Sequence, residues 1–210
     1  MPGPNITVAR LPLEQIPAAA RLLARAFADD PVLTYFLNDA ERRRLAYSAF
    51  FRASLSEHWE AGHVYGAYVE GRLAGSAVWS PPSPSPPSAK FARRAARNHA
   101  IVLANFPQQI PAMQRGYVAV KKLHPTEPHW YLTFIGVDPS AQGRSLGTHL
   151  LAPVLRIADK RREPCFLETP FPETHRFYGR LGFVLQPPSR PFKGAAKVWT
   201  MLRPPAGSSK

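Results

Sequence analysis

The stretch YLTFIGVDPSAQGRSLGT, residues 131–148, predicts a strand, a turn and the first turn of a helix in direct succession. Apolar residues dominate positions 131–137, as in a strand whose two faces are both covered. The pair Asp138-Pro139 then favours a turn. From residue 146 onward, apolar side chains recur at helical spacing and form one stripe: Leu146, Leu150, Leu151, Val154, Leu155 and Ala158.

The glycine-containing loop that opens this helix predicts an anion site. Backbone N–H groups in the first turn of a helix have no helical acceptor, and the helix dipole adds roughly half a positive charge. Arg144 would add a formal charge, so the loop suits a phosphate or a diphosphate. Gly143 and Gly147 match neither a Walker A loop nor a dinucleotide fingerprint. The alternative is a plain strand-to-helix connection in which the glycines only relieve crowding.

Away from this stretch, hydrophobic periodicity predicts alternating strands and helices, which indicates an α/β protein with a central sheet. We expect strands over residues 6–11, 64–69, 73–79, 129–137, 165–169, 183–185 and 197–202. We expect helices over residues 14–28, 41–60, 89–106, 147–162 and 174–181. The proline-rich segment 81–88 cannot form a helix or a central strand, and we interpret it as an exposed loop within one domain rather than a domain boundary. We expect disorder over residues 1–4 and 204–210.

The composition limits the class of protein. The 210 residues suit one domain, and a hydrophobic fraction of 45% excludes a wholly disordered chain. The 27 Lys and Arg against 14 Asp and Glu give a net charge of +13, which attracts polyanions such as nucleic acid or a phosphate-rich cofactor. The single cysteine, Cys165, cannot form an internal disulfide. With no signal peptide and no apolar run of roughly 20 residues, we expect a cytoplasmic protein without a membrane partner.

Two motifs resemble the acyl-CoA-contacting segments of the GNAT superfamily of acyltransferases. Gln142-Gly143-Arg144-Ser145-Leu146-Gly147 is similar to the family's Gln/Arg-x-x-Gly-x-Gly/Ala loop, and FYGRLGF, residues 177–183, is similar to its Phe-Tyr-x-x-x-Gly-Phe segment. The similarity is nearly continuous from residue 127 to residue 184, and it points to puromycin N-acetyltransferase-like members. It implies one α/β GNAT domain over residues 5–203, with an acyl-CoA-binding core over residues 127–186. The expected sheet is mixed, mostly antiparallel and twisted, with six to seven strands flanked by helices.

The resemblance also implies the chemistry. In this family a primary amine attacks the thioester of acetyl-CoA directly, without a covalent enzyme intermediate, and we expect the amine of a small molecule here. The glycine loop would hold the diphosphate, and the strand before it, which separates from its neighbour in the family, would hold the pantetheine amides. The cofactor-binding residues that the resemblance implies are Phe134, Ile135, Gly136, Val137, Gln142, Gly143, Arg144, Ser145, Leu146, Gly147, Thr148, Thr174, Phe177 and Arg180.

The sequence departs from the family's pattern at two of these positions. Ser145 occupies the family's middle glycine, where a Cβ obstructs a closely approaching diphosphate or the hydroxyl donates a hydrogen bond to it. Thr174 stands where many relatives carry an asparagine that contacts pantetheine.

Two residues are candidates for proton transfer. We expect Tyr178 to be the general acid, because a phenol with a pKa of about 10 can protonate a leaving thiolate; the alternative is an aromatic side chain that only packs between sheet and helix. We expect Glu168 to take the amine proton or to anchor a cationic substrate; the alternative is a structural carboxylate. Glu168 and Phe166 should share one face of their strand.

The substrate-binding residues that the resemblance implies are Asp30, Tyr35, Phe36 and Trp130. An exposed helix end explains Asp30 equally well. The histidine pairs at 58 and 63 and at 124 and 129 lack a third ligand at a diagnostic spacing, so we expect no metal. Two other functions stay open: a non-enzymatic nucleic-acid-binding protein that uses the basic residues 93–97, and a GNAT enzyme that acetylates protein amino groups. Because the sequence contains no known nucleic-acid-binding motif, we do not expect nucleic acid as the partner. A homodimer also stays open.

Overall fold

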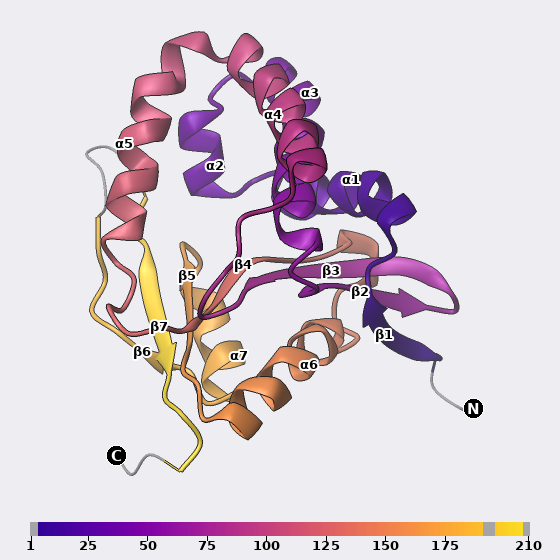
Figure 1. The fold of residues 1–210 in the computed structure, drawn as a ribbon, viewed down its shortest axis with the longest axis vertical. Coiled ribbons are helices and arrows are strands. Elements are labelled where there is room, and N and C mark those ends of the chain that lie inside the picture. The colour runs from indigo at the N-terminus through magenta and orange to yellow at the C-terminus, as the bar shows by residue number, and fades with distance from the viewer. Residues whose placement is uncertain (1–3, 191–195, 208–210) are drawn as a thin grey trace.

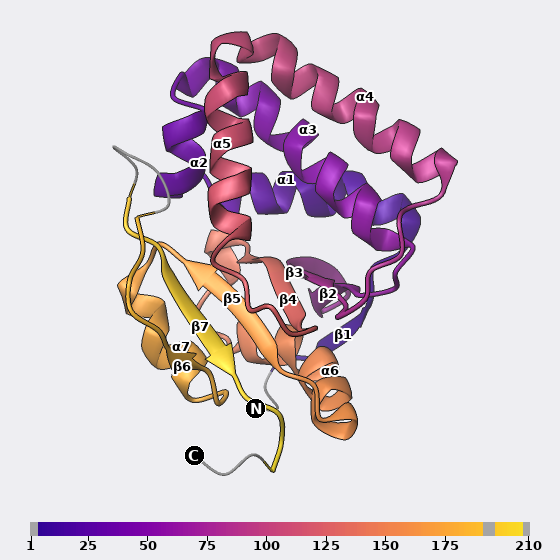
Figure 2. The same ribbon diagram turned by 60° about the vertical axis from the view of Figure 1, so that its left-hand side comes forward.

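The computed structural model describes residues 4–190 and 196–207, and one seven-stranded sheet runs through its middle (Figure 1, Figure 2). The strand order is β1-β2-β3-β4-β5-β7-β6, and among these strands only β4 and β5 run parallel. The sheet is therefore mixed and mostly antiparallel, as predicted. The strands are β1 (Ile6–Arg10), β2 (Val64–Val69), β3 (Arg72–Ser80), β4 (Trp130–Val137), β5 (Cys165–Thr169), β6 (Val184–Leu185) and β7 (Trp199–Arg203).

Helices cover both faces of the sheet. On one face lie α1 (Ile16–Ala26), α2 (Pro31–Phe36), α3 (Ala40–Trp59), α4 (Ala89–Asn105) and α5 (Ile110–Lys121). On the other face lie α6 (Leu146–Arg161) and α7 (His175–Gly179). Short 3-10 turns occupy Leu13–Gln15, Pro107–Gln109, Pro139–Ala141 and Pro172–Thr174. Each face has its own hydrophobic core, because the two faces of the sheet present alternate side chains to different helices.

Most predicted elements are confirmed, and two helices are new. The strands predicted over residues 64–69 and 165–169 have those bounds, and the other predicted strands are displaced by one or two residues at their ends. The helix expected over residues 14–28 is shorter, because it begins after a 3-10 turn and ends at Ala26. The sequence did not predict α2 or α5. Residues 81–88 form neither a helix nor a strand. The disorder expected over residues 1–3 and 208–210 concerns positions outside the described residues.

Strand β4 contains a bulge in its middle. Val78 pairs with Phe134, but Trp79 pairs with Leu132, so Thr133 is an extra residue on β4. An extra residue reverses the alternation of side chains along a strand. Leu132 consequently lies in the core beneath α6, whereas Phe134 lies in the core beneath α1 and α3.

Strands β4 and β5 pair only where they begin. Trp130 is opposite Cys165 and Tyr131 is opposite Phe166, and the described residues form no further ladder between the two strands. From residue 132 onward, β4 therefore has no strand partner on its β5 side. This confirms the separation of strands that the resemblance implied, and it leaves backbone N–H and C=O groups of β4 available to a ligand.

Candidate active site

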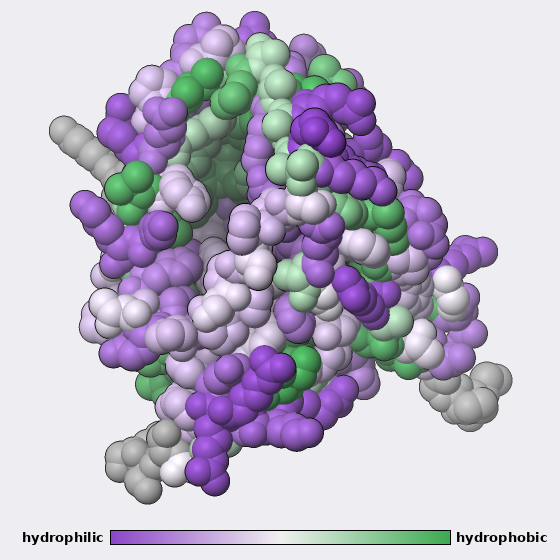
Figure 3. Space-filling model, viewed as in Figure 1, coloured by the Kyte–Doolittle hydropathy of each residue, from purple (hydrophilic) through white to green (hydrophobic). Residues whose placement is uncertain are grey.

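A cavity of about 450 Å³ opens beside the point where β4 and β5 separate. Residues of α2, α5, β4, β5 and α7 line it, and Figure 3 shows a hollow with hydrophobic walls in the upper half of the molecule, between α5 and α4. Its volume is within the range of roughly 300–1,000 Å³ that small-molecule sites occupy. Of the predicted site residues, it brings together Asp30, Phe36, Phe134, Ile135, Glu168, Thr174 and Tyr178.

Glu168 is one of two carboxylate residues that line this cavity, together with Asp30. The Tyr131 hydroxyl donates a hydrogen bond of 3.0 Å to its Oε1, and the imidazole Nε2 of His124 lies 3.7 Å from the same oxygen. Its Oε2 is buried and has no hydrogen-bond partner among the described residues. Burial, followed by the charge of Glu168 and this hydrogen bond, holds the pKa of Tyr131 well above its ordinary value. Tyr131 therefore acts as a fixed donor to one carboxylate oxygen of Glu168.

The neighbourhood of Glu168 confirms the predicted face of β5. The rings of Phe166 and Tyr131 lie 6.3 Å apart, and the ring of His124 lies within 4.8 Å of both. His124 Nδ1 lies 3.2 Å from Nε2 of His129, and His129 Nδ1 lies 2.8 Å from the carbonyl oxygen of Glu127. A short row of polar groups thus leads from Glu168 towards the surface.

Tyr178 also faces the cavity, from helix α7. Its side chain is 7% exposed, and burial raises the pKa of its phenol above the ordinary value. The rings of Phe177 and Phe183 contact the phenol ring at 4.9 and 5.9 Å and fix its position. No described residue hydrogen-bonds its hydroxyl group. A protonated phenol without a protein acceptor can donate to a ligand.

The loop between β4 and α6 has the backbone that an anion site needs. Gly143 has a φ of +78°, and the space where a Cβ would lie is open. Ser145 also adopts the left-handed conformation, with a φ of 60°, and caps α6 without a side-chain hydrogen bond. The N–H groups of residues 145–148 donate to no described residue. The departure at Ser145 therefore leaves the loop in the conformation that a glycine would favour.

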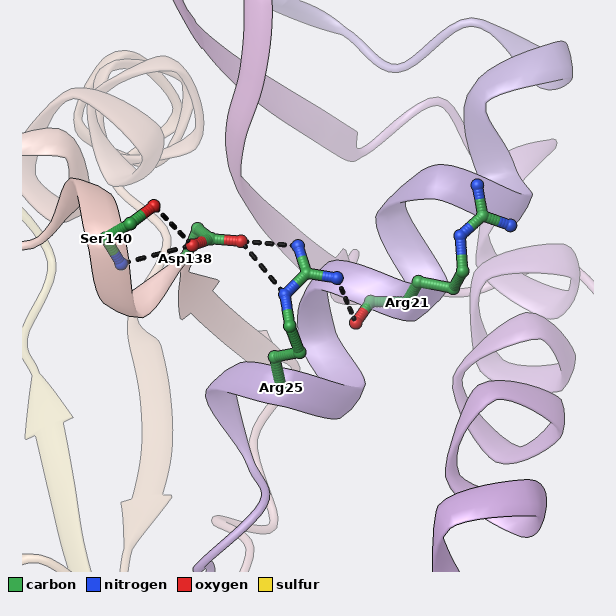
Figure 4. A network of polar contacts seen from close by, with 4 residues as sticks. All are labelled: Arg21, Arg25, Asp138 and Ser140. Atoms are coloured by element: carbon green, nitrogen blue, oxygen red, sulfur yellow. Dashed lines mark hydrogen bonds and ion pairs between the residues drawn. The ribbon is translucent and has the colours of Figure 1, made fainter.

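Two contacts hold this loop in place. Phe177 lies against Gly147, where an added Cβ would be 3.0 Å from the ring, so the second motif packs directly on the first. On the other side, the guanidinium of Arg25 on α1 binds the carboxylate of Asp138, which also accepts from the amide and the hydroxyl of Ser140 (Figure 4). The hydrogen bond from Arg25 is the main reason that the pKa of Asp138 lies below its ordinary value.

Asp30 begins helix α2 rather than forming an exposed helix end. Its side chain is 5% exposed, and its Oδ1 accepts from the amides of Val32 at 2.9 Å and Leu33 at 2.8 Å. Desolvation by burial is the larger effect on its pKa, which is raised above the ordinary value. The exposed-end interpretation is therefore wrong, and this carboxylate caps a helix at the wall of the cavity.

The predicted place of Trp130 in the acceptor pocket is wrong. Its side chain is fully buried in the core beneath α6, where its indole N–H donates to Glu163 at 2.7 Å. Adjacent strand residues face opposite sides, so Tyr131, and not Trp130, looks into the cavity. Tyr35 does not line the cavity either; its ring packs edge-on against Phe36.

The remaining predicted cofactor residues lie on β4, on the loop and first turn of α6, and on or beside α7. Gly136 and Val137 continue β4 beyond the cavity towards the loop. Gln142, Arg144, Thr148 and Arg180 are exposed at the loop, at the first turn of α6 and at the end of α7, and Leu146 is buried beneath that turn. The hydroxyl of Thr174 donates to the carbonyl oxygen of Phe171 at 2.7 Å, so it closes a local turn.

The sequence missed the contribution of α5 to the site. Met113, Gly116, Tyr117 and Val120 recur at spacings of three and four and present one face of α5 to the cavity. Pro107 and Pro111 both lie in the first turn of a 3-10 turn or a helix, where proline is accepted. That signal was available in the sequence.

The histidine pairs show no metal cluster. Within residues 4–190 and 196–207, no group of three or more His, Cys, Asp or Glu is arranged to hold a metal ion. His58 lies 2.8 Å from the carbonyl oxygen of Ser54 and 3.0 Å from the hydroxyl of Ser80. Over the same residues, no helix combines the length and the apolar character that crossing a membrane requires.

Comparison with known proteins places this arrangement in a family. Residues 28–183 match the acetyltransferase (GNAT) family. An uncharacterised N-acetyltransferase of Schizosaccharomyces pombe is 25% identical over 180 residues, which cover 80% of this chain and 70% of the relative.

Solved structures share the fold. A structure from Corynebacterium glutamicum, described as a histone acetyltransferase and related acetyltransferase, has a TM-score of 0.73 at 23% identity, over 98% of this chain and 99% of that one. A Drosophila melanogaster polyamine N-acetyltransferase has a TM-score of 0.51 at 18% identity, over 94% and 99%. The family match spans the cavity, both motifs and the separated strands, and the chain belongs to the acetyltransferase (GNAT) family, and with it to the acyl-CoA-dependent N-acetyltransferases.

Proposed function

We propose that the protein transfers an acetyl group from acetyl-CoA to the primary amine of a small molecule, by direct attack and without a covalent enzyme intermediate. The observation that carries this proposal is the cavity at the separation of β4 and β5, whose lining includes both the carboxylate residue Glu168 and the phenol residue Tyr178. The match to the acetyltransferase (GNAT) family favours an enzyme over the alternative of a non-enzymatic nucleic-acid-binding protein.

The residues present fit acetyl-CoA. The unpaired edge of β4 over residues 134–137 offers backbone groups to the amides of a pantetheine arm. The N–H groups of residues 145–148, the open space at Gly143 and the exposed Arg144 suit a diphosphate. When bound, acetyl-CoA supplies an acyl group activated as a thioester.

Two side chains of the protein would transfer the protons of the reaction, one from the attacking amine and one to the leaving sulfur. Glu168 is positioned to receive a proton from the attacking amine, since its side chain lines the cavity and is 13% exposed. Tyr178 keeps its proton because burial raises its pKa, so the phenol can donate where a leaving sulfur carries negative charge. Holding both reactants beside these groups contributes several kcal/mol to catalysis by itself, on the order of 7–11 kcal/mol for well-oriented intramolecular reactions.

A small-molecule acceptor is favoured over a protein amino group. The cavity is bounded by α2 and α5 as well as by the sheet, and a flexible chain terminus would have to pass between these helices. The puromycin N-acetyltransferase-like subtype and the cytoplasmic location stay predictions from motifs and from the single cysteine.

Thermal unfolding with and without acetyl-CoA tests the donor, and release of the CoA thiol with a panel of amines tests the reaction. We expect saturable stabilisation, of about 2.7 kcal/mol when the ligand is at 100 times its Kd. Absence of both stabilisation and thiol release would contradict the proposed function.

A further inference from the structure

The walls of the cavity are apolar over most of their extent. Helix α5 contributes Met113 and Val120 from one face, and α2 contributes Leu33. Phe27, at the end of α1, and Phe50, on α3, complete this wall. The rings of Phe27 and Phe50 lie 5.7 and 5.8 Å from that of Phe134, in edge-to-face geometry. Such a surface binds an apolar or aromatic body by removing it from water.

The threonines of the cavity are satisfied within the protein. The hydroxyl of Thr133 lies 3.2 Å from that of Ser80, and the hydroxyls of Thr169 and Thr174 lie 3.1 Å from each other. These groups add little polarity to the walls, because their hydrogen bonds are made elsewhere.

The two carboxylates of the cavity differ in what they offer. Asp30 caps α2 through two backbone amides, which both bind its Oδ1 and hold the carboxylate at the start of that helix. Glu168 has a buried oxygen without a partner among the described residues. A substrate ammonium group beside the Glu168 carboxylate would compensate this buried negative charge. Of the two carboxylates, Glu168 receives one hydrogen bond and Asp30 receives two, so we place the ammonium group at Glu168.

A second charge on the substrate would meet the apolar walls. An ammonium group buried against Met113, Val120 or Phe50 would lose its hydration and gain no hydrogen bond or opposite charge in exchange. The net charge of +13 adds a general repulsion towards polycations. Both effects disfavour the polyamines that the Drosophila melanogaster structure is named for.

We propose that the acceptor is a monoamine with a hydrophobic body of aromatic size, whose ammonium group lies at Glu168 and whose body lies between α2, α5 and the two phenylalanines Phe27 and Phe50. This substrate class rests on the proposed function, because it assigns the acceptor of the same reaction.

The first experiment compares kcat/KM of the wild-type protein for 2-phenylethylamine, hexylamine, agmatine and spermidine, by release of the CoA thiol. We expect 2-phenylethylamine to exceed both agmatine and spermidine by at least about tenfold, because a second buried charge is costly. Hexylamine should lie nearer to 2-phenylethylamine, because it carries one charge and an apolar body.

A matched pair of variants tests the wall itself. Val120→Asp adds a carboxylate to the inner face of α5, and Val118→Asp adds the same group to the outer face, where Val118 is 52% exposed and does not line the cavity. We expect Val120→Asp to lower the preference for 2-phenylethylamine over spermidine by about tenfold, and Val118→Asp to leave it unchanged. Circular dichroism and stabilisation by acetyl-CoA verify that each variant is folded.

The outcomes separate this inference from the proposed function. Equal or better turnover of agmatine or spermidine overturns the substrate class and leaves the acetyltransferase reaction standing. Stabilisation by acetyl-CoA without turnover of either monoamine also overturns it. If neither stabilisation nor turnover is seen, the proposed function fails first. Should Val120→Asp not fold, the wild-type comparison decides alone.

Discussion

The two carboxylate oxygens of Glu168 have different surroundings. The Tyr131 hydroxyl donates to Oε1, whereas Oε2 is buried and has no hydrogen-bond partner in the part of the chain that the structure describes. The sequence located Glu168 and its shared face with Phe166, because alternation along a strand is a local property. It could not identify Tyr131, because its hydrogen bond joins residues 37 positions apart on different strands. It also misplaced Trp130, because strand alternation alone does not say which face looks into a cavity.

Glu168→Gln should lower kcat/KM for amines by about 10- to 100-fold, because a hydrogen bond to a charged group contributes ~1.5–3 kcal/mol. Affinity for acetyl-CoA should change little, since the side chain lies away from the glycine loop. Steady-state kinetics and calorimetry measure the two effects. Glu173→Gln is the control, because Glu173 is exposed on the turn that follows β5, and its variant should retain wild-type kinetics.

Tyr178→Phe should lower kcat by about 100-fold, a typical contribution of general acid catalysis, with little change in coenzyme affinity. Burial raises the pKa of this phenol, so the acid form persists in the folded protein from pH 7 to pH 9 and turnover should not fall in that window through its ionisation. The stability that this shift contributes is present below the unfolded pKa of about 10 and is lost as pH rises beyond it. An unchanged kcat in the variant, with chemistry rate-limiting, would remove Tyr178 from the mechanism.

The two helices that the sequence did not predict, α2 and α5, both have a proline in their first turn. Pro31 follows the segment predicted as the first helix, and it is the first residue of α2, with Asp30 as its N-cap. Pro111 is the second residue of α5. A proline is excluded from helix interiors but accepted in the first turn. The same residue can therefore indicate the end of one helix or the beginning of the next. The helices with long apolar stripes, α1, α4 and α6, were predicted because their periodicity outweighs such ambiguity.

Gly143→Trp should weaken acetyl-CoA affinity at least about tenfold, equivalent to ~1.4 kcal/mol, because an indole would fill the open side of the loop. Gly71 offers a matched control. It has a φ of +74° against +78° for Gly143, and the space around its missing Cβ is equally open, but it lies in the turn between β2 and β3. Gly71→Trp should therefore carry the same backbone strain and bind acetyl-CoA like the wild type. Equal losses of affinity in both variants, by calorimetry, would mean that strain and not the loop is responsible.

The whole sheet consists of two parts that meet at two residue pairs. β1 to β4 form one part and β5, β7 and β6 form the other, joined by the parallel pairs at the start of β4 and β5. Periodicity predicted the strands but not the bulge at Thr133, because the bulge depends on pairing with β3 rather than on local preference. The family resemblance, and not periodicity, supplied the expectations that the sheet is mixed and that β4 and β5 separate.

Amide hydrogen exchange should detect whether acetyl-CoA binds to the backbone of β4 and of the loop before α6. Binding of acetyl-CoA should slow exchange within residues 132–137 and 145–148, because their unpaired N–H groups would gain acceptors. Amides of β1 and β2, which are already paired with each other, serve as the internal reference. Equal slowing throughout the chain would indicate general stabilisation and no local contact with these groups.

The short ladder between β4 and β5 has a consequence for engineering this protein. Extending it by further pairs would add backbone hydrogen bonds, each contributing about 1 kcal/mol, and would close the slot beside Glu168. A selection for heat resistance that ignores turnover should therefore favour variants with a longer β4–β5 ladder, which would be more stable but inactive. Thermostabilising substitutions are better sought at Arg162, whose backbone is left-handed with a φ of 53° at the far end of α6, where Arg162→Gly relieves strain without touching the slot.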